Sequence, residues 1–384
     1  MKKSILYWGP FIDSNIATVK AMYNSAIAIN KYSEKYKISI INTVGEWNQK
    51  KNDNQSLEFI DLNLSNLDKL PKHGFIKSRV SYWIIFIKSF FPLKKLLMEK
   101  KPEFLIIHLL VSLPMLLFVL FKFKTKLILR ISGKPKLNIL RILIWKIASN
   151  KINMVFCPTE ETRNHLIKNR IFEPNKIFLL YDPVINLKNF VNLKKNNEVL
   201  DDRFQKGNII LVGRLTKQKN FNLIIEACKK NERLINKFKI FIFGEGEQEK
   251  YLKNKVRRYK LENKIIFLGY KKNIYKYMAT SKIFILTSLW EDPGFVLVEA
   301  AMNNLTILSS NCSSGPKEII NKNELGGYLF DNNDSLSLNK KLNFLIDDNE
   351  INIFKKKLYA KKNIMNFTLF RHSKILQKHL NSSI

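Results

Sequence analysis

Short apolar runs alternate with helical stretches along this chain of 384 residues. Runs with the length and composition of buried strands occupy residues 4–8, 38–43, 104–109, 126–131, 154–157 and 177–180 in the first half, and 208–212, 239–243, 264–268, 283–287 and 306–309 in the second. Apolar strands separated by helices are typical of parallel sheets that are covered on both faces. We therefore expect an α/β protein with two doubly wound, Rossmann-like domains that face a cleft.

The length of the chain and one polar stretch predict where the domains divide. Apolar residues make up 46% of the sequence, which is enough to fill two cores. Residues 186–207 are polar with scattered apolar side chains, and we place a linker at 191–206 within them. This predicts an N-terminal domain over 1–190 and a C-terminal domain over 207–365. A last helix over 366–384 can pack on either domain, including back on the first.

Two apolar segments bear on localisation. Residues 104–121 carry no formal charge and reach the length of about 18 residues at which a membrane span is considered. The segment also divides into a strand and a helix that opens at Ser112, followed by another strand, and we favour this interpretation. At the N-terminus, Gly9-Pro10 and Asp13 end the apolar run before it reaches signal-peptide length. We expect a cytoplasmic protein.

The chain is strongly basic, with 66 Lys and Arg against 32 Asp and Glu and a net charge of +34. Such a field attracts phosphorylated ligands, polyanions and anionic lipid surfaces. Heavy use of Lys, Asn and Ile along the whole chain explains the same excess, so the charge supports an anionic partner without identifying one. The three cysteines lie far apart and the five histidines form no close pair. We therefore expect no disulfide framework, no metal site and no cofactor.

Loops that follow predicted strands carry the candidate chemistry, because doubly wound sheets bind ligands at the carboxyl ends of their strands. The loop over residues 213–220 leads into a helix and contains Arg214 and Lys219. Cations beside the N-terminus of a helix suit a phosphate, although a solvated basic turn has the same composition. After the next strand, Gly244 and Gly246 allow a tight turn and a close approach of the backbone.

Two glutamates, Glu291 and Glu299, lie on either side of Pro293-Gly294. Pro and Gly exclude helix through this turn. We therefore expect a helix over 295–302 with Glu299 in its first turns and Glu291 on the loop before it. Carboxylates only accept hydrogen bonds, so two of them set apart in this way suit a ligand rich in hydroxyl groups. An ordinary solvated Glu near a helix start is the alternative.

Together these segments resemble the donor-binding domain of retaining GT-B glycosyltransferases of the glycosyl transferases group 1 class (family 4). Glu291 and Glu299 fit the E-x7-E motif of that family. The first half is similar more loosely, through Gly9-Pro10, His108, RISG and CPTEETRNHL. The segments that carry the resemblance in the second half are VGRLTKQKN, FGEGEQEKYL, IIFLGYKKN with the residues up to SSGPKEII, and GYLF.

The resemblance implies an enzyme of the hexosyltransferase type. It would move a sugar, with retention, from a nucleotide-diphosphate-sugar to a glycan or polyprenyl-linked acceptor in bacterial surface polysaccharide biosynthesis. UDP is the nucleotide expected from the family. The sugar, the acceptor and the linkage stay open.

The resemblance also implies roles by position. Arg214 and Lys219 would hold the diphosphate and, without a metal, stabilise the charge that develops on it. Glu299 would bind the ribose hydroxyls, Glu291 would contact the donor sugar, and His108 would approach that sugar from the other domain. A buried core histidine is the alternative for His108. The other donor-binding positions are Gly213, Gly244, Gly246, Pro293, Gly294, Phe295 and Val296, and the acceptor-side positions are Gly9, Asp13 and Asn15.

The chain departs from the family pattern in two places. Many relatives carry a Gly-Gly pair in the first loop, where this chain has Gly9-Pro10 followed by Asp13-Ser14-Asn15. The details of the acceptor side are therefore expected to differ. Asp182-Pro183-Val184 replaces a motif like Asn-Pro-Val, and we expect its effect on the hinge between the domains.

Residues 75–101 interleave aromatic and aliphatic residues with lysines and an arginine. Helices of this composition lie well on anionic membrane surfaces, which predicts a peripheral enzyme on the inner face of the cytoplasmic membrane. A helix that packs its apolar stripe on the sheet explains most of the same residues. Two other functions stay open: a nucleotide-sugar epimerase or phosphorylase on the same fold, and a basic nucleic-acid-binding protein. No recognised motif indicates a specific nucleic-acid partner.

Overall fold

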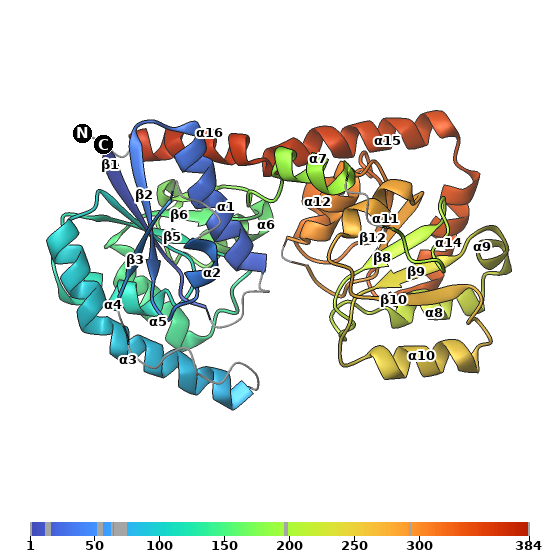
Figure 1. The fold of residues 1–384 in the computed structure, drawn as a ribbon, viewed down its shortest axis with the longest axis horizontal. Helices are drawn as coiled ribbons and strands as arrows, with labels where there is room; N and C mark the ends of the chain where they lie inside the picture. Colours follow the sequence, from blue (N-terminus) through green and yellow to red (C-terminus); the bar gives the residue numbers. More distant parts are fainter. Residues whose placement is uncertain are drawn as a thin grey trace. The chain divides into compact units, whose positions relative to one another are not determined.

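The computed structural model describes residues 2–11, 17–51, 57–62, 64, 75–195, 199–291 and 293–382. The chain forms two compact units, one made of Met1–Val184 with Leu369–Ile384 and the other of Ile185–Thr368 (Figure 1). Each unit contains one parallel sheet with helices packed on it. The α/β class and the two Rossmann-like domains expected from the sequence are confirmed.

The first unit contains a seven-stranded sheet of order β3-β2-β1-β4-β5-β6-β7. Its strands are β1 (Lys3–Trp8), β2 (Tyr36–Asn42), β3 (Glu58–Asp61), β4 (Phe104–Ile107), β5 (Lys126–Arg130), β6 (Ile152–Cys157) and β7 (Ile177–Leu179). Its helices are α1 (Ala17–Tyr32), α2 (Asn48–Lys51), α3 (Phe75–Lys100), α4 (Ser112–Leu120), α5 (Ile139–Ser149), α6 (Glu160–Lys168) and α16 (Leu369–Ser382). One core lies between the sheet and α3 to α6, and the other lies between the opposite face and α1 with α16.

The second unit contains a six-stranded sheet of order β10-β9-β8-β11-β12-β13. Its strands are β8 (Ile209–Val212), β9 (Ile240–Phe243), β10 (Ile265–Gly269), β11 (Ile283–Leu286), β12 (Thr306–Ser310) and β13 (Tyr328–Phe330). Its helices are α7 (Leu187–Lys195), α8 (Asn222–Lys229), α9 (Glu232–Lys237), α10 (Glu249–Arg258), α11 (Ile274–Thr280), α12 (Phe295–Met302), α13 (Gly315–Ile320), α14 (Ser335–Asp347) and α15 (Glu350–Asn363).

All eleven predicted strands are present, and each contains a short apolar run of the kind that is buried in a parallel sheet. The structure adds β3 and β13. The first is a partly exposed edge strand with the sequence EFID, and the second has only three residues. The segment 104–121 forms β4 and α4, as the strand-helix interpretation predicted. Within the described ranges, no helix has both the length and the apolar character of a membrane span.

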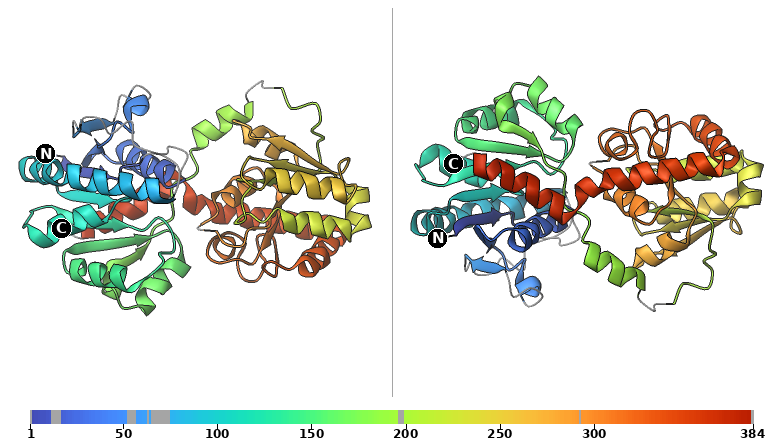
Figure 2. Two further views of the ribbon diagram at one scale, coloured as in Figure 1. Left: turned by 90° about the horizontal axis from the view of Figure 1, so that it is seen from below. Right: turned by 90° about the horizontal axis from the view of Figure 1, so that it is seen from above.

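The closing helix α16 packs along α1 in the first unit (Figure 2). Ser25 Oγ lies 2.8 Å from Nε2 of His372, whose Nδ1 donates to the carbonyl oxygen of Tyr181 at 2.8 Å. The predicted domain limits at 190 and 207, and the linker between them, fall inside the second unit. Residues 187–195 of this stretch form α7, which packs on α11.

The segment Asp182-Pro183-Val184 ends the first unit. A buried ion pair holds it to β5, since Arg130 Nη2 lies 2.5 Å from Asp182 Oδ1. Asn24 Nδ2 donates to the Pro183 carbonyl oxygen at 2.7 Å. The residues expected to influence a hinge are thus anchored to the first unit on one side of the point where the chain leaves it.

Candidate functional site

Each sheet reverses its strand order at one point, between β1 and β4 in the first unit and between β8 and β11 in the second. Doubly wound sheets bind ligands beside the carboxyl ends of the strands at such a point. In the second unit, the loops that follow β8 and β11 carry Arg214, Lys219 and Glu291. In the first unit, Gly9 follows β1 and His108 follows β4. The predicted residues therefore stand where this topology places ligands.

Backbone hydrogen bonds hold the loops after β8 and β11 against each other. The Leu289 amide donates to the Gln218 carbonyl oxygen at 2.8 Å, and Gln218 Nε2 donates to the Trp290 carbonyl oxygen at 3.0 Å. Thr287 Oγ1 donates to the Lys219 carbonyl oxygen at 2.8 Å. These hydrogen bonds join the two loops, which follow the buried strands β8 and β11.

Glycine allows the loop after β9 to approach the loop after β8. Gly244 has φ of +127°, and a Cβ atom there would overlap the Gly213 carbonyl oxygen. A Cβ at Gly246 would lie 2.5 Å from the Leu215 carbonyl oxygen. Only glycine combines this backbone conformation with so close a contact. The predicted role of these glycines in tight backbone approach is confirmed.

The turn before α12 places Glu291 and Glu299 on separate elements. Gly294 has φ of +83° and caps α12, which spans Phe295–Met302 as predicted. Pro293 and Gly294 are both buried, whereas Phe295 and Val296 are partly exposed at the start of the helix. Glu291 therefore lies on the loop, and Glu299 lies on the second turn of α12.

Glu291 and Lys219 form a largely buried ion pair. Lys219 Nζ lies 2.5 Å from Glu291 Oε1, and the two side chains are 16% and 6% exposed. Ser288 Oγ donates to the same Oε1 at 2.5 Å. Both interactions use Oε1, so within the described part of the chain Oε2 has no hydrogen-bond donor. This oxygen is available to accept from a hydroxyl group of a ligand.

The other two predicted side chains have different surroundings. Arg214 is exposed, and its guanidinium makes no ion pair or hydrogen bond with any residue that the structure describes. Glu299 is partly buried and accepts from the Tyr275 hydroxyl at 3.0 Å. Burial raises the pKa of Tyr275 well above its ordinary value, and the Glu299 charge acts in the same direction. The tyrosine therefore stays a donor and fixes the carboxylate.

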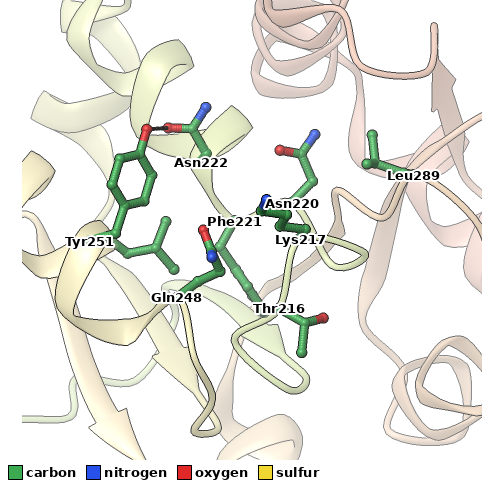
Figure 3. Close-up of a pocket in the computed structure, with 9 residues that line it drawn as sticks. Thr216, Lys217, Asn220, Phe221, Asn222, Gln248, Tyr251 and Leu289 are labelled. Carbon is green, nitrogen blue, oxygen red and sulfur yellow. Dashed lines mark hydrogen bonds between the residues drawn. The ribbon is translucent and has the colours of Figure 1, made fainter. Parts of the chain in front are cut away.

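An open hollow of about 570 Å³ lies on another side of the loop after β8 (Figure 3). Thr216, Asn220 and Leu289 line it together with Gln248 and Tyr251 at the start of α10. None of Arg214, Lys219, Glu291 and Glu299 is among its lining residues. This hollow is thus lined by residues other than the charged pair.

In the first unit, His108 is buried next to Gly9. A Cβ at Gly9 would meet the Met22 sulfur and lie 3.4 Å from His108 Cβ. Burial holds the pKa of His108 well below its ordinary value, and the Arg130 charge adds to this. The ring is therefore neutral, and its Nε2 has no partner among the described residues. Asp13 and Asn15 lie outside the described residues.

Sequence reasoning missed three side chains that support these positions: Ser288, Tyr275 and Arg130. Arg130 is 2% exposed, and its Nε and Nη1 have no partner among the described residues. An arginine inside the apolar run KLILRIS was a usable signal, because a buried charge is costly unless it has a function or a partner. Ser288 and Tyr275 carried no comparable signal.

Comparison with known proteins identifies the second unit. Residues 192–363 match the family model described as glycosyl transferases group 1. This segment is a glycosyl transferases group 1 domain. It contains Lys219, Glu291 and Glu299, so the charged pair belongs to the group 1 domain.

Two relatives extend the likeness beyond the group 1 domain. An uncharacterized glycosyltransferase of Methanocaldococcus jannaschii is 26% identical over 61% of this chain and 62% of its own length. An N-acetylgalactosamine-N,N'-diacetylbacillosaminyl-diphospho-undecaprenol 4-alpha-N-acetylgalactosaminyltransferase of Campylobacter jejuni is 29% identical over 52% of this chain and 53% of its own length. The matches thus leave more than a third of each relative's length uncovered.

The fold has solved counterparts over the whole chain. The structure of Anabaena Alr3699/HepE in complex with UDP superposes with a TM-score of 0.70 and covers all of both chains at 14% identity. At this identity the likeness establishes the fold and no more. The two Rossmann-like domains are those of a GT-B glycosyltransferase fold.

Proposed function

We propose that this protein is a retaining glycosyltransferase of the hexosyltransferase type. It transfers a sugar from a UDP-sugar to a lipid-linked or glycan acceptor in the biosynthesis of a bacterial polysaccharide. The observation that carries the proposal is the Lys219–Glu291 pair at the strand-order reversal of a group 1 domain. Support for the ligand classes comes from the UDP in the Anabaena structure and the diphospho-undecaprenol in the name of the Campylobacter relative.

In the proposed reaction, the bond between the anomeric carbon and the β-phosphate oxygen breaks, and a bond to the acceptor oxygen forms on the same face of the sugar. The acceptor proton passes to the departing phosphate, so no side chain has to act as a general base. Negative charge grows on the diphosphate as the bond breaks. We assign the electrostatic stabilisation of that charge to Arg214 and Lys219, and the proposal invokes no metal ion.

The carboxylates bind the neutral parts of the donor. Glu291 Oε2 accepts from a hydroxyl of the sugar while Oε1 stays with Ser288 and Lys219. Glu299, oriented by Tyr275, accepts from the ribose hydroxyls. His108 is assigned to the donor sugar; its neutral imidazole has one nitrogen, Nε2, without a hydrogen-bond partner among the described residues. Gly9, Asp13 and Asn15 are assigned to the acceptor.

Thermal-shift measurements with UDP, UDP-glucose, UDP-galactose and UDP-N-acetylglucosamine test donor binding, because a ligand that binds only the folded state raises its stability. Glu299→Ala is expected to weaken UDP binding about tenfold or more, which is the loss of one to two charge-assisted hydrogen bonds. Lys219→Ala is expected mainly to lower kcat. Lys217→Ala, on the same loop but outside the charged pair, is the matched control.

Product analysis separates transfer from the alternatives. UDP that appears only when an acceptor is added indicates transfer, whereas an isomerised donor or acceptor-independent cleavage indicates an epimerase or phosphorylase. Steep salt-dependent RNA binding that Glu291→Gln leaves unchanged would favour a nucleic-acid-binding protein. Full activity of both Glu299→Ala and Lys219→Ala would refute the site assignment.

A further inference from the structure

The outer sides of helices α3, α4 and α5 expose large apolar side chains. On α5, Ile139, Leu143 and Ile147 follow one another at four-residue intervals and are 79%, 53% and 64% exposed. The line Trp83, Ile87 and Phe91 on α3 has the same spacing and is also exposed. Leu116 and Leu120 on α4 complete the set.

These helices are neighbours on one face of the first sheet. They are consecutive crossovers between β3, β4, β5 and β6, and α4 packs against both α3 and α5 (Figure 1). Their inner sides fill the core with other residues, such as Leu97, Leu117 and Trp145. The exposed apolar residues are therefore different from the residues that face the core. A helix that only packs its apolar stripe on the sheet, which is the alternative interpretation of residues 75–101, does not explain them. We call these exposed apolar residues of α3, α4 and α5 the outer apolar face.

The charges on the same helices have almost one sign. The sequences of α3, α4 and α5 contain eight Lys or Arg residues and one acidic residue, Glu99. Glu99 lies within ion-pair distance of Lys95, at 3.8 Å. A hollow on α3 is lined by Phe91, Pro92 and Met98 together with the charged residues Lys94, Lys95 and Glu99. Apolar floors bordered by cations suit a lipid whose headgroup is an anion.

We infer that the outer apolar face docks on the surface of an anionic phospholipid bilayer. The apolar side chains enter the region between headgroups and acyl chains, and the lysines and arginines contact the phosphates. A second copy of this chain is a poorer occupant, because the same positive charge would face itself across the contact. The inference goes beyond the proposed function, since docking requires neither donor nor acceptor.

Co-sedimentation with vesicles tests the docking of the full chain. Vesicles of phosphatidylcholine with phosphatidylglycerol are compared with vesicles of phosphatidylcholine alone, at low and high salt. The wild type is expected to bind the anionic vesicles and to lose affinity as salt rises. The triple variant Ile139→Gln, Leu143→Gln, Ile147→Gln is expected to bind the anionic vesicles about tenfold or more weakly than the wild type. The reason is that it removes the apolar contacts that α5 makes with the bilayer.

The matched control is the triple variant Ile351→Gln, Phe354→Gln, Leu358→Gln. These residues are also exposed, at 69%, 57% and 50%, on the lysine-rich helix α15 of the second unit. The control is expected to bind vesicles like the wild type, and circular dichroism shows that both variants fold. The inference is wrong if the wild type ignores anionic vesicles at low salt, if the α5 variant binds unchanged, or if the control loses binding instead. A dimer that the α5 variant converts to monomer, with vesicle binding intact, would assign the face to self-association.

Discussion

Removing either member of the Lys219–Glu291 pair should destabilise the second unit, and the two effects should not add. At the observed separation of 2.5 Å, the gross attraction is about 7 kcal/mol for an effective dielectric constant of about 20 and about 2 kcal/mol for one of about 80. The side chains are mostly buried, so the value lies nearer the first figure before the cost of desolvation is counted. Desolvation of both ions offsets much of it, which leaves an expected coupling of about 2–3 kcal/mol.

A double-mutant cycle measures this coupling. Lys219→Met and Glu291→Gln keep the size of each side chain and remove its charge, and the double variant closes the cycle. Hydrogen exchange at increasing urea, followed on peptides from β8 and β11, reports the unfolding of the second unit separately from the first. Each single variant should lose about 2 kcal/mol or more, because it leaves the other ion without its partner. The double variant should lose clearly less than the sum.

A coupling below about 0.5 kcal/mol, the range of exposed surface pairs, would refute the reasoning. It would mean that the two charges do not share the low-dielectric surroundings that their burial indicates. Lys217→Met in place of Lys219→Met provides the matched control. The Lys217 side chain lies on the same loop but is exposed, so its cycle with Glu291→Gln should show no coupling.

Three further perturbations test a close backbone contact, a buried ion pair and a buried carboxyl group. Gly244→Ala should lower the free energy of unfolding by about 3 kcal/mol and abolish UDP binding, because the new Cβ meets a backbone carbonyl at φ of +127°. Its control is Gly207→Ala, at φ of +76° with open space around it, which should lower the free energy of unfolding in urea by only about 1 kcal/mol. Arg130→Ala should lower the free energy of unfolding by about 3–5 kcal/mol in the same assay, because it leaves Asp182 buried without its partner. A loss under about 1 kcal/mol would show that the ion pair does not contribute to stability. Glu46 lies on the loop between β2 and α2, and burial raises its pKa from 4.5 to about 7. The folded state therefore binds this proton more tightly than the unfolded chain, and the free energy of unfolding falls as pH rises through this window. Glu46→Gln should flatten that dependence in pH-stepped urea titrations, and an unchanged slope would contradict the assigned pKa.

The sequence predicted most of the strands because each contains a short run of apolar residues, which is typical of buried parallel strands. It missed β3, an edge strand with the sequence EFID, in which only two apolar residues stand between two acidic ones. It also predicted the helix over 295–302, since Pro293 and Gly294 fix where that helix can begin. The composition of a strand and the residues that begin a helix are local properties, so they can be recognised in a single sequence.

The arrangement around Glu291 depends on contacts that sequence spacing does not encode. Lys219 is 72 residues away from Glu291, and the two meet only because β8 and β11 are neighbours across the strand-order reversal. Lys219 and Ser288 contact the same carboxylate oxygen of Glu291, and this depends on the rotamers of the three side chains. A single sequence can therefore predict which residues reach the site, but not which of their atoms stay available to a ligand.

The ion pair also gives Lys219 and Arg214, two cations of the loop after β8, different electrostatic surroundings. Glu291 already compensates much of the charge of Lys219, whereas Arg214 has no acidic partner among the described residues. An ammonium carries three donors, and within the described chain only one of those on Lys219 is used by a side chain. In the proposed reaction Lys219 can therefore touch the diphosphate and Glu291 together, and so link the leaving group to the carboxylate that holds the sugar. In the same proposal, Arg214 supplies the uncompensated positive charge, and Lys219 couples the leaving group to the carboxylate that holds the sugar.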